Sequence, residues 1–480
     1  MYFAIIIGYL GINKYIDKRL PDIFLSVNTM KKIHIISIGG AVMHNIAIQL
    51  AAKGNLVTGS DDIVFDPSKS RLEEHGLLPE TMGWDASRIH SDLDYVVLGM
   101  HAKGDNPELL KAIELGIPIY SFPSFIRHRA QNKRIVVAGS HGKTTTTSMI
   151  VHLLKELGQE ADYLIGAKID GLSDVVRFDD RPYFIIEGDE YPSSAIDLQS
   201  KFMHYDPHFI ILTGIAWDHM NIFPTYESYF STFENLFASL DPSTTIIYNG
   251  LDKEVCRLIE KFPKLRAKPY HIIPYQIQNE EFVLEGGYPL QIVGQHNVSN
   301  LTAAIMLCQE LGFESEKLFE AATHFGGASR RLQLISENKQ SKVYLDFAHA
   351  PSKVKASVGA IKEISEGKIL VAVLELHTFS SLNSEFLPQY KDALAKADIA
   401  LVMFDPQIVA NKKMKALEFD EIKKAFNRND LIIINSRTVL EGELQKIFTS
   451  LQSKKFNLVF MSSGSFGGLD IKKFIEAKVD

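Results

Sequence analysis

The stretch between Arg134 and Leu157 constrains the possible folds more than any other part of the chain. Its pattern predicts a short buried strand over 134–138, a glycine turn, and a helix over 145–157. A strand that passes through a tight glycine turn into a helix opens a strand–helix–strand unit, and repeated units of this kind build a parallel sheet covered by helices. The stretch therefore predicts an α/β fold.

The same alternation of apolar runs and helical patterns recurs in three blocks. The predicted strands are 33–38, 55–58, 95–98 and 117–120 in the first block, 134–138, 183–186, 209–213 and 244–248 in the second, and 343–347, 369–374, 399–404, 431–434 and 457–461 in the third. Short alternation rich in Pro and Gly predicts hairpins over 264–293, before a helix over 297–311. We therefore predict three α/β domains over 31–131, 132–328 and 329–480.

Composition narrows the class of protein. With 46% hydrophobic and 23% charged residues, the chain has the balance of a soluble globular protein. A formal net charge of -7 gives no basic footprint for nucleic acid or for an anionic membrane. Two cysteines support neither a disulfide framework nor a zinc cluster, which suits a reducing cytosol. We expect a cytoplasmic protein that binds small molecules, as a monomer or homodimer.

Residues 1–30 are predicted to lie outside the fold. The apolar run from Met1 to Leu10 is too short to span a bilayer, and basic residues follow it where a signal peptide would have a cleavage site. Met30, just ahead of the first predicted strand, is the expected working start.

The glycine turn after 134–138 is the strongest chemical signal. Glycine amides and a helix N-terminus can face phosphate oxygens, Lys143 adds a full positive charge, and Thr144 offers a hydroxyl to Mg²⁺. Val137 stands where the strict pattern has its first glycine, so the loop is a compact variant; a purely structural turn is the alternative. The candidate phosphate-binding residues are Gly139, Ser140, His141, Gly142, Lys143, Thr144 and Thr145.

Acidic and imidazole side chains follow two later strands. Glu187-Gly-Asp-Glu190 comes directly after 183–186, and Asp218-His219 comes shortly after 209–213. The carboxyl ends of parallel strands meet at the ligand crevice of an open sheet, where such groups can complete magnesium coordination. Either cluster alone is more typical of a solvated loop. Together with the glycine turn they predict that groups of these two clusters bind a metal ion beside the phosphates.

The first block has its own glycine turn at Gly39-Gly40. A dinucleotide pattern would also need glycine at Ser37 and Val42, so the spacing alone is a weak signal. Backbone amides at a helix start can still accept a diphosphate. A structural turn remains the alternative.

A series of motifs occurs in the order seen in Mur ligases, and the chain resembles that family over 31–480. The motifs are Gly139-Ser-His-Gly-Lys-Thr-Thr-Thr, Glu187-Gly-Asp-Glu-Tyr, Trp217-Asp-His-Met, Gly294-Gln-His-Asn-Val-Ser-Asn300, Ser329-Arg-Arg331 and Asp346-Phe-Ala-His349. The resemblance implies a Rossmann-like UDP-binding domain, a central P-loop ATPase-type domain and a C-terminal Rossmann-like domain. It also implies ATP and Mg²⁺ as cofactors.

Within the family, the likeness is to the muropeptide-recycling ligases, which join UDP-N-acetylmuramate to L-alanyl-γ-D-glutamyl-meso-diaminopimelate. Phe65-Asp-Pro-Ser and the segments 200–205 and 461–468 support this likeness. The implied reaction is phosphoryl transfer from ATP to the lactyl carboxylate, followed by attack of an amine on the acyl phosphate. Alanine-adding ligases are the alternative. A folate-type polyglutamate ligase, which lacks the separate first block, and a catalytically silent relative are rival interpretations.

The resemblance also implies a role for each candidate residue. Thr144, Glu187 and His219 would bind Mg²⁺, and Lys143, Glu187, His219 and His349 would take part in catalysis. His296, Asn297 and Asn300 would border the adenine, and Arg331 and Asp346 would meet the phosphate and ribose side of the nucleotide. Gly39, Gly40, Ser60 and Asp61 would hold the UDP group, and His377 would lie at the amine site.

The chain departs from the recycling ligases where the incoming amine would be held. Ala350 replaces a histidine, and His377 replaces an arginine whose bidentate charge an imidazole cannot reproduce. The identity of the amine therefore stays open. Lys353 and Lys355 could supply charge, although a lysine-bearing helix face is more often solvated. Glu234 stands where some members carry a carbamylated lysine, and since it is already a carboxylate we expect no carbamylation.

Overall fold

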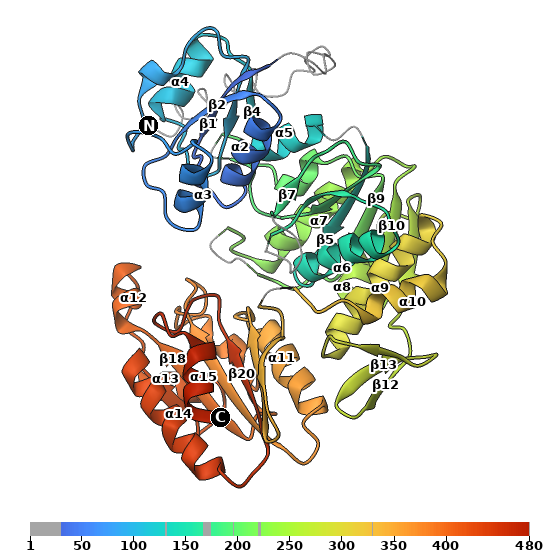
Figure 1. Ribbon diagram of the computed structural model, residues 1–480, viewed down its shortest axis with the longest axis vertical. Helices are drawn as coiled ribbons and strands as arrows, with labels where there is room; N and C mark the ends of the chain where they lie inside the picture. The colour runs from blue at the N-terminus through green and yellow to red at the C-terminus, as the bar shows by residue number, and fades with distance from the viewer. Residues whose placement is uncertain are drawn as a thin grey trace.

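The computed structural model describes residues 30–129, 132–166, 174–194, 196–218, 222–328 and 330–479. The predicted α/β fold is confirmed, because the described chain forms three main sheets flanked by helices (Figure 1). We call each sheet with its helices the N-terminal, central and C-terminal body. The prediction for 1–29 and the role of His219 lie outside the described residues.

The N-terminal body is a parallel sheet in the order β2-β1-β3-β4. Helix α4 begins where the Asn106 side chain accepts hydrogen bonds from two backbone amides and Pro107 takes the first helical position. The strands are β1 (Lys32–Ile36), β2 (Leu56–Ser60), β3 (Tyr95–Leu98) and β4 (Ile119–Ser121), and the helices are α2 (Met43–Ala52), α3 (Ser68–Glu74), η2 (Ala86–Arg88), α4 (Pro107–Glu114) and α5 (Phe122–Arg129).

The central body is a larger sheet in the order β11-β10-β9-β5-β8-β6-β7, parallel except for β7. β5 lies in the middle, so the glycine turn that follows it opens at the middle of the carboxyl edge. The strands are β5 (Lys133–Ala138), β6 (Asp162–Leu164), β7 (Val176–Arg177), β8 (Tyr183–Glu187), β9 (Phe209–Leu212), β10 (Thr245–Asn249) and β11 (Arg266–Tyr270), and the helices are α6 (Lys143–Glu156), η3 (Lys201–His204), α7 (Tyr226–Ser239), α8 (Lys253–Glu260), α9 (Gln295–Glu310) and α10 (Ser315–Thr323).

The prediction of hairpins over 264–293 is only partly right. β12 (Tyr275–Gln278), β13 (Glu281–Leu284) and β14 (Tyr288–Leu290) form a small antiparallel sheet. β11 instead joins the central sheet as a parallel edge strand, a position where its Pro269 is tolerated. Asn279 and Glu280 both have positive φ, which matches the two-residue turn that β12 and β13 require.

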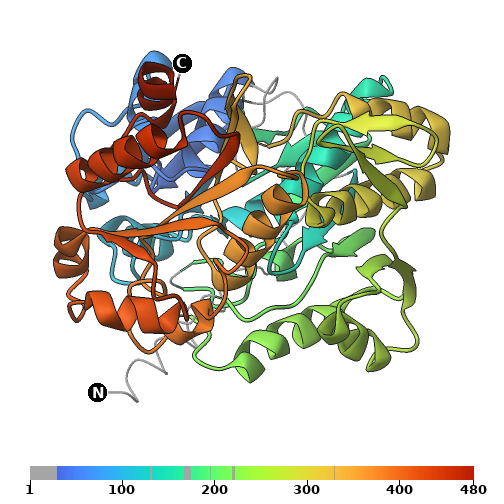
Figure 2. The ribbon, with the colours of Figure 1, turned by 90° about the horizontal axis from the view of Figure 1, so that it is seen from below.

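The C-terminal body is a sheet in the order β15-β16-β20-β17-β18-β19, parallel except for β15, and helices cover both of its faces (Figure 2). The antiparallel edge strand β15 was not predicted. The strands are β15 (Gln333–Glu337), β16 (Ser341–Asp346), β17 (Ile369–Leu376), β18 (Ile399–Phe404), β19 (Ile432–Ile434) and β20 (Phe456–Met461), and the helices are α11 (Pro351–Glu363), η4 (Leu387–Tyr390), α12 (Pro406–Asn411), α13 (Phe419–Ala425), α14 (Arg437–Leu451) and α15 (Ile471–Val479).

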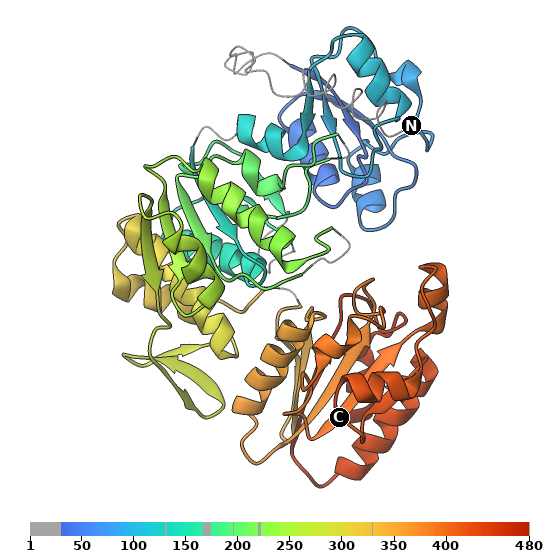
Figure 3. The ribbon, with the colours of Figure 1, turned by 180° about the vertical axis from the view of Figure 1, so that it is seen from behind.

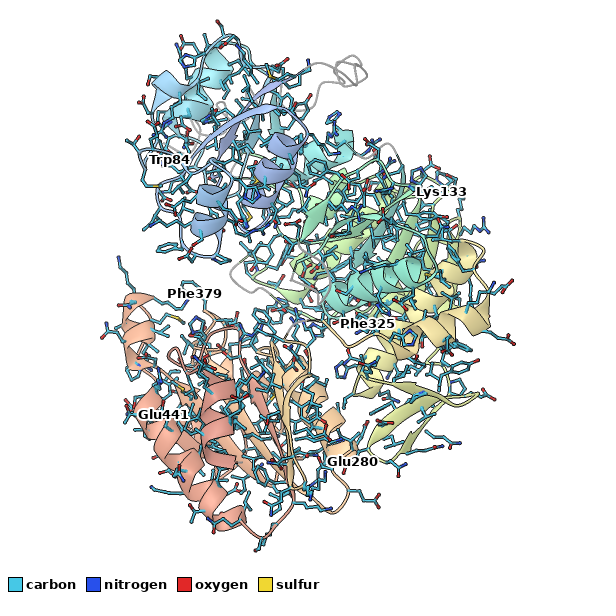
Figure 4. The ribbon with its side chains drawn as sticks, viewed as in Figure 1. Trp84, Lys133, Glu280, Phe325, Phe379 and Glu441 are labelled. Carbon is cyan, nitrogen blue, oxygen red and sulfur yellow. The ribbon has the colours of Figure 1, made fainter. Side chains whose placement is uncertain are left out.

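The central body contacts both of the others, while the ribbons of the N-terminal and C-terminal bodies stand apart in opposite views (Figures 1 and 3). The β12–β13 turn meets the C-terminal body through Glu280, whose carboxylate lies 2.6 Å from Lys368 Nζ and 3.2 Å from Lys342 Nζ (Figure 4). Among the described residues, no helix is long and apolar enough to cross a membrane.

Candidate active site

A cavity of about 530 Å³ lies at the carboxyl edge of the central sheet. The C-terminal body supplies one wall, and Val42 and Phe122 of the N-terminal body reach its rim. Most candidate residues of the central and C-terminal bodies line it together: Ser140, His141, Gly142, Lys143, Thr144, Thr145, Glu187, His296, Asn297, Asn300, Arg331, Asp346 and His349. Side chains separated by about two hundred residues in sequence are therefore brought to one place.

The glycine turn between β5 and α6 has a backbone that requires glycine. Gly139 and Gly142 have φ of 128° and 79°, in the region that other residues rarely adopt. A Cβ at Gly142 would lie 2.3 Å from Asn300 Oδ1, so the loop packs directly on α9. Ser140 Oγ accepts a hydrogen bond from the Ala216 amide at 2.8 Å, which fixes the loop against the segment after β9. The loop is thus held open and rigid at the start of a helix.

Lys143 lies at the first position of α6, among carboxylates. Its Nζ donates to Gly139 O at 2.6 Å and to Glu190 Oε2 at 2.7 Å. Burial would lower the pKa of Lys143, but the charges of Glu190 and Asp189 raise it above its usual value, so the amine stays protonated. Tyr229 donates from its hydroxyl to Glu190 Oε1 at 3.2 Å and fixes that carboxylate. The loop therefore presents a permanent cation.

Oxygen groups suited to a divalent cation lie beside the loop. Thr144 Oγ1 donates to Glu187 Oε1 at 2.8 Å, and the Gly166 amide donates to Glu187 Oε2 at 2.6 Å. Hydroxyl and carboxylate oxygens are the ligands that Mg²⁺ prefers, usually with phosphate oxygens and water in the remaining positions. Among the described residues, no group of three His, Cys, Asp or Glu side chains forms a protein-only metal cage. Thr144 and Glu187 fit a magnesium ion that is shared with a phosphate.

The N-terminus of α11 brings the C-terminal body to the loop. Ser352 Oγ lies 2.6 Å from His141 Nε2, and Lys353 Nζ lies 3.2 Å from Asp218 Oδ2. Burial lowers the pKa of His141 to about 3 and that of His349 to about 4. Both imidazoles are therefore neutral near pH 7.

The remaining nucleotide-binding candidates form the far side of the cavity. The guanidinium of Arg331 lies over the Phe347 ring, with Cζ 5.0 Å from the ring centroid. The buried carboxylate of Asp346 accepts a hydrogen bond from Ser357 Oγ. Burial lowers the pKa of His296, although the charge of Asp346 opposes that shift. These groups combine a planar cation, a carboxylate and a neutral ring.

The candidate UDP-binding residues do not line this cavity. The Gly39 amide donates to Asp61 Oδ2 at 2.8 Å, and burial raises the pKa of Asp61 to about 6 even though that hydrogen bond opposes the shift. Ser60 is fully buried, and its hydroxyl donates to the buried Glu108 carboxylate. The side chains of Ser60 and Asp61 are thus committed to contacts within the N-terminal body. A ligand at this turn would therefore bind to backbone atoms of these residues and to Gly40, and not to the side chains of Ser60 and Asp61.

His377 lies near a buried carboxylate of the C-terminal body and does not line the cavity. Its Nδ1 is 3.9 Å from Glu375 Oε1, and a Cβ at Gly464 would lie 2.7 Å from that nitrogen. Glu375 accepts hydrogen bonds from Ser462 Oγ and from the Phe466 amide. His377 is therefore placed against the 462–468 segment after β20.

Sequence reasoning missed several side chains at the site. Glu190, the ion-pair partner of Lys143, was seen only as one member of an acidic cluster, and Tyr229 had no motif to mark it. The interpretation of Lys353 as a solvated lysine is wrong, because its side chain is 21% exposed and paired with Asp218. Lys355, by contrast, is exposed.

Glu234 stands where some members of the family carry a carbamylated lysine. Its carboxylate pairs with Lys261 Nζ, and Glu234 is not among the residues that line the cavity.

The chain is similar to known proteins along most of its length. Residues 32–134 match the domain described as "Mur ligase family, catalytic domain", and residues 137–308 match "Mur ligase middle domain". UDP-N-acetylmuramate–L-alanine ligase of Caldicellulosiruptor bescii is 31% identical, over 78% of this chain and 83% of the relative. UDP-N-acetylmuramate–L-alanyl-γ-D-glutamyl-meso-2,6-diaminoheptandioate ligase of Haemophilus influenzae is 29% identical, over 92% of this chain and 98% of the relative. The crystal structure of UDP-N-acetylmuramate-alanine ligase from Thermotoga maritima has a TM-score of 0.65 at 22% identity, over 93% of this chain and 98% of that one, a likeness of fold.

Proposed function

The chain belongs to the Mur ligase family, and we propose that it joins an amine to the lactyl carboxylate of UDP-N-acetylmuramate at the expense of ATP. It is an ATP-dependent, amide-bond-forming ligase. The observation that supports this most is the shared cavity, where the loop around Lys143 faces Arg331, Asp346 and His349 from the C-terminal body. The reaction would take place in the cytoplasm, where ATP and UDP-N-acetylmuramate are found. The three proposed domains of the protein are 31–131, 132–328 and 329–480.

The first candidate for the amine is the tripeptide L-alanyl-γ-D-glutamyl-meso-diaminopimelate. The Haemophilus influenzae relative, whose name contains this tripeptide, aligns with 92% of the chain. The alanine ligase of Caldicellulosiruptor aligns with 78%. L-Alanine is the second candidate. A catalytically silent relative is less consistent with the site, because Lys143, Thr144 and Glu187 are all present and form the hydrogen bonds described above.

The reaction has two chemical steps. A carboxylate oxygen attacks the γ-phosphorus of ATP, the bond to the β,γ-bridging oxygen breaks, and ADP leaves. The neutral amine then attacks the carbonyl carbon of the acyl phosphate, inorganic phosphate leaves with the bonding electrons, and the amine loses a proton. Positioning and charge neutralisation are the main contributions of the protein in such phosphoryl transfers.

The residues of the chain can provide both contributions. The amides of the glycine loop and Lys143 would bind the phosphates, with Arg331 and Asp346 on the nucleotide from the other side. Thr144 and Glu187 would hold Mg²⁺, which neutralises phosphate charge when bound; His219 is proposed as a third ligand. His349 donates from Nδ1 to Phe347 O at 2.8 Å, so in its neutral form Nε2 is the basic nitrogen.

A direct assay tests the proposal. Purified protein is incubated with ATP, Mg²⁺, UDP-N-acetylmuramate and either the tripeptide, L-alanine or no amine, and products are identified by mass spectrometry while ADP is measured. A new amide with the tripeptide supports the first candidate, and an amide with L-alanine alone supports the second. Absence of amide product and of substrate-dependent ADP release with every amine would contradict the ligase assignment.

A further inference from the structure

Lys353 occupies a position that is electrostatically unfavourable for a lysine. It lies in the first turn of α11, where the helix dipole favours negative charge, and that turn contains no acidic residue. Its side chain is also mostly buried, and burial lowers its pKa below the usual value. Within the part of the chain that the structure describes, the ion pair with Asp218, at 3.2 Å, offsets these costs. A cation in this position is suited to a negatively charged partner in addition to Asp218.

The surroundings of Lys353 indicate what that partner is. Lys353, Lys143 and Arg331 all line the same cavity, and the positive charges of Lys143 and Arg331 further lower the pKa of Lys353. Mutual repulsion of this kind shows that the cations converge on one region. His141 and His349, which also lie there, are neutral and add no charge. The cavity is therefore suited to a compact group with several negative charges, such as the end of a triphosphate.

The two amines have matching arrangements on opposite walls. Lys143 comes from the central body and pairs with Glu190 at 2.7 Å, while Lys353 comes from the C-terminal body and pairs with Asp218 at 3.2 Å. Lys143 follows the glycine loop, so it lies where the β- and γ-phosphates of a nucleotide bind. Lys353 lines the same cavity from the C-terminal body.

We propose that Lys353 binds the terminal phosphoryl group of ATP, exchanging its ion pair with Asp218 for a phosphate oxygen. This inference rests on the proposed function. It assigns to the C-terminal body a cation that stabilises the charge on the transferred group, while Lys143 does so from the central body. Lys353 thus distinguishes ATP from ADP, since ADP lacks the group it binds.

Nucleotide affinity tests the proposal without turnover. Binding of a non-hydrolysable ATP analogue and of ADP, each with Mg²⁺, is measured by calorimetry for the wild type, Lys353→Met, Lys353→Arg and the exposed neighbour Lys355→Met. Lys353→Met should weaken binding of the ATP analogue about tenfold or more, as expected for loss of a charge-assisted hydrogen bond, and ADP binding less than about threefold. Lys353→Arg should restore most of the difference, and Lys355→Met should change neither affinity.

Equal weakening of both nucleotides would overturn the proposal, because a purely structural ion pair between bodies affects them alike. Unchanged affinity for the ATP analogue in Lys353→Met would also overturn it. Lys143→Met serves as the reference, since it should weaken both nucleotides. If the wild type binds neither nucleotide, the proposed function itself fails; if it binds both and Lys353→Met has no selective effect, only the role of Lys353 fails.

Discussion

Two glycine turns in this molecule look alike in sequence and differ in structure. Gly39-Gly40 connects β1 to α2, and Gly139–Gly142 connects β5 to α6, each after a buried parallel strand. In the first turn the Gly39 amide is bound by Asp61 of the same body, and neither glycine has positive φ. In the second, both glycines have positive φ and a lysine follows at once. Glycine content alone thus does not distinguish the two turns; the backbone conformation and the lysine that follows do.

Replacing the cation tests the comparison most strongly. Lys143→Met should lower turnover about a thousandfold, because the cation that holds the phosphates and stabilises the transferred group is lost. Binding of UDP should be unchanged, since the N-terminal turn uses no residue of this loop. Turnover is followed by ADP release, and UDP binding by calorimetry. Turnover near the wild-type level would show that the cation after the second turn is not needed for phosphoryl transfer.

Gly142→Ala tests the backbone of the second turn. The φ of 79° and the distance of 2.3 Å from the new Cβ to Asn300 Oδ1 mean that the loop and α9 must separate. Nucleotide affinity should fall by about 30-fold, the equivalent of about 2 kcal/mol of strain. Calorimetry with ADP measures it. Wild-type affinity in a folded variant would show that the loop shape is not needed.

Asp61→Asn tests the internal hydrogen bond of the first turn. Burial raises the pKa of Asp61 to about 6, so the folded protein binds a proton at this carboxyl more tightly than the unfolded chain does. Protonation of Asp61 therefore stabilises the fold. This stabilisation is fully present below about pH 4 and is lost as the pH rises through about 6. Between pH 4 and pH 7 the free energy of unfolding of the wild type should therefore fall by about 2 kcal/mol relative to that of Asp61→Asn.

Urea unfolding of the N-terminal body measures this difference. Trp84 lies in that body, and a Trp217→Phe background removes the other tryptophan of the chain. Parallel pH profiles for the two proteins would show that Asp61 is ionised in the fold without cost.

Gly39→Ala should have the smallest effect. A Cβ there meets Asp61 Oδ2 and Val64 Cγ2 at 2.9 Å, which are side-chain atoms that can shift, and its φ is not in the left-handed region. We expect a loss of about 1 kcal/mol in the free energy of unfolding of the N-terminal body, with ADP affinity unchanged. The same urea experiment measures the loss. A failure to fold would show that the first turn is as restrictive as the second.

The parts of the fold and site that depend on neighbouring residues in sequence were predictable. The buried runs that became β5, β8 and β17, and the loop from Ser140 to Thr145, follow from local periodicity and glycine placement. The short strand β15 was missed because Gln333–Glu337 contains two apolar residues, Leu334 and Ile335, which are too few for a clear pattern, and because its pairing with β16 is set by packing.

The ion-pair partners of the charged side chains at the site could not be predicted from the sequence. Glu187 and Glu190 are close in sequence, yet only Glu190 forms the ion pair with Lys143, because the chain bends after β8 and turns Glu187 toward Thr144. The ion pair of Lys353 was missed for the same reason, since its partner Asp218 is far away in the sequence. Its pattern is that of an exposed helix face, and only the docking of α11 on the central body buries it.

The contact at Glu280 has a consequence for the response to salt. The C-terminal body forms ion pairs with the central body at two places, Glu280 with Lys342 and Lys368, and Lys353 with Asp218. The side chains in these pairs are only 10% to 28% exposed. Buried pairs are screened by salt much less than exposed ones. High ionic strength should therefore leave the two bodies docked.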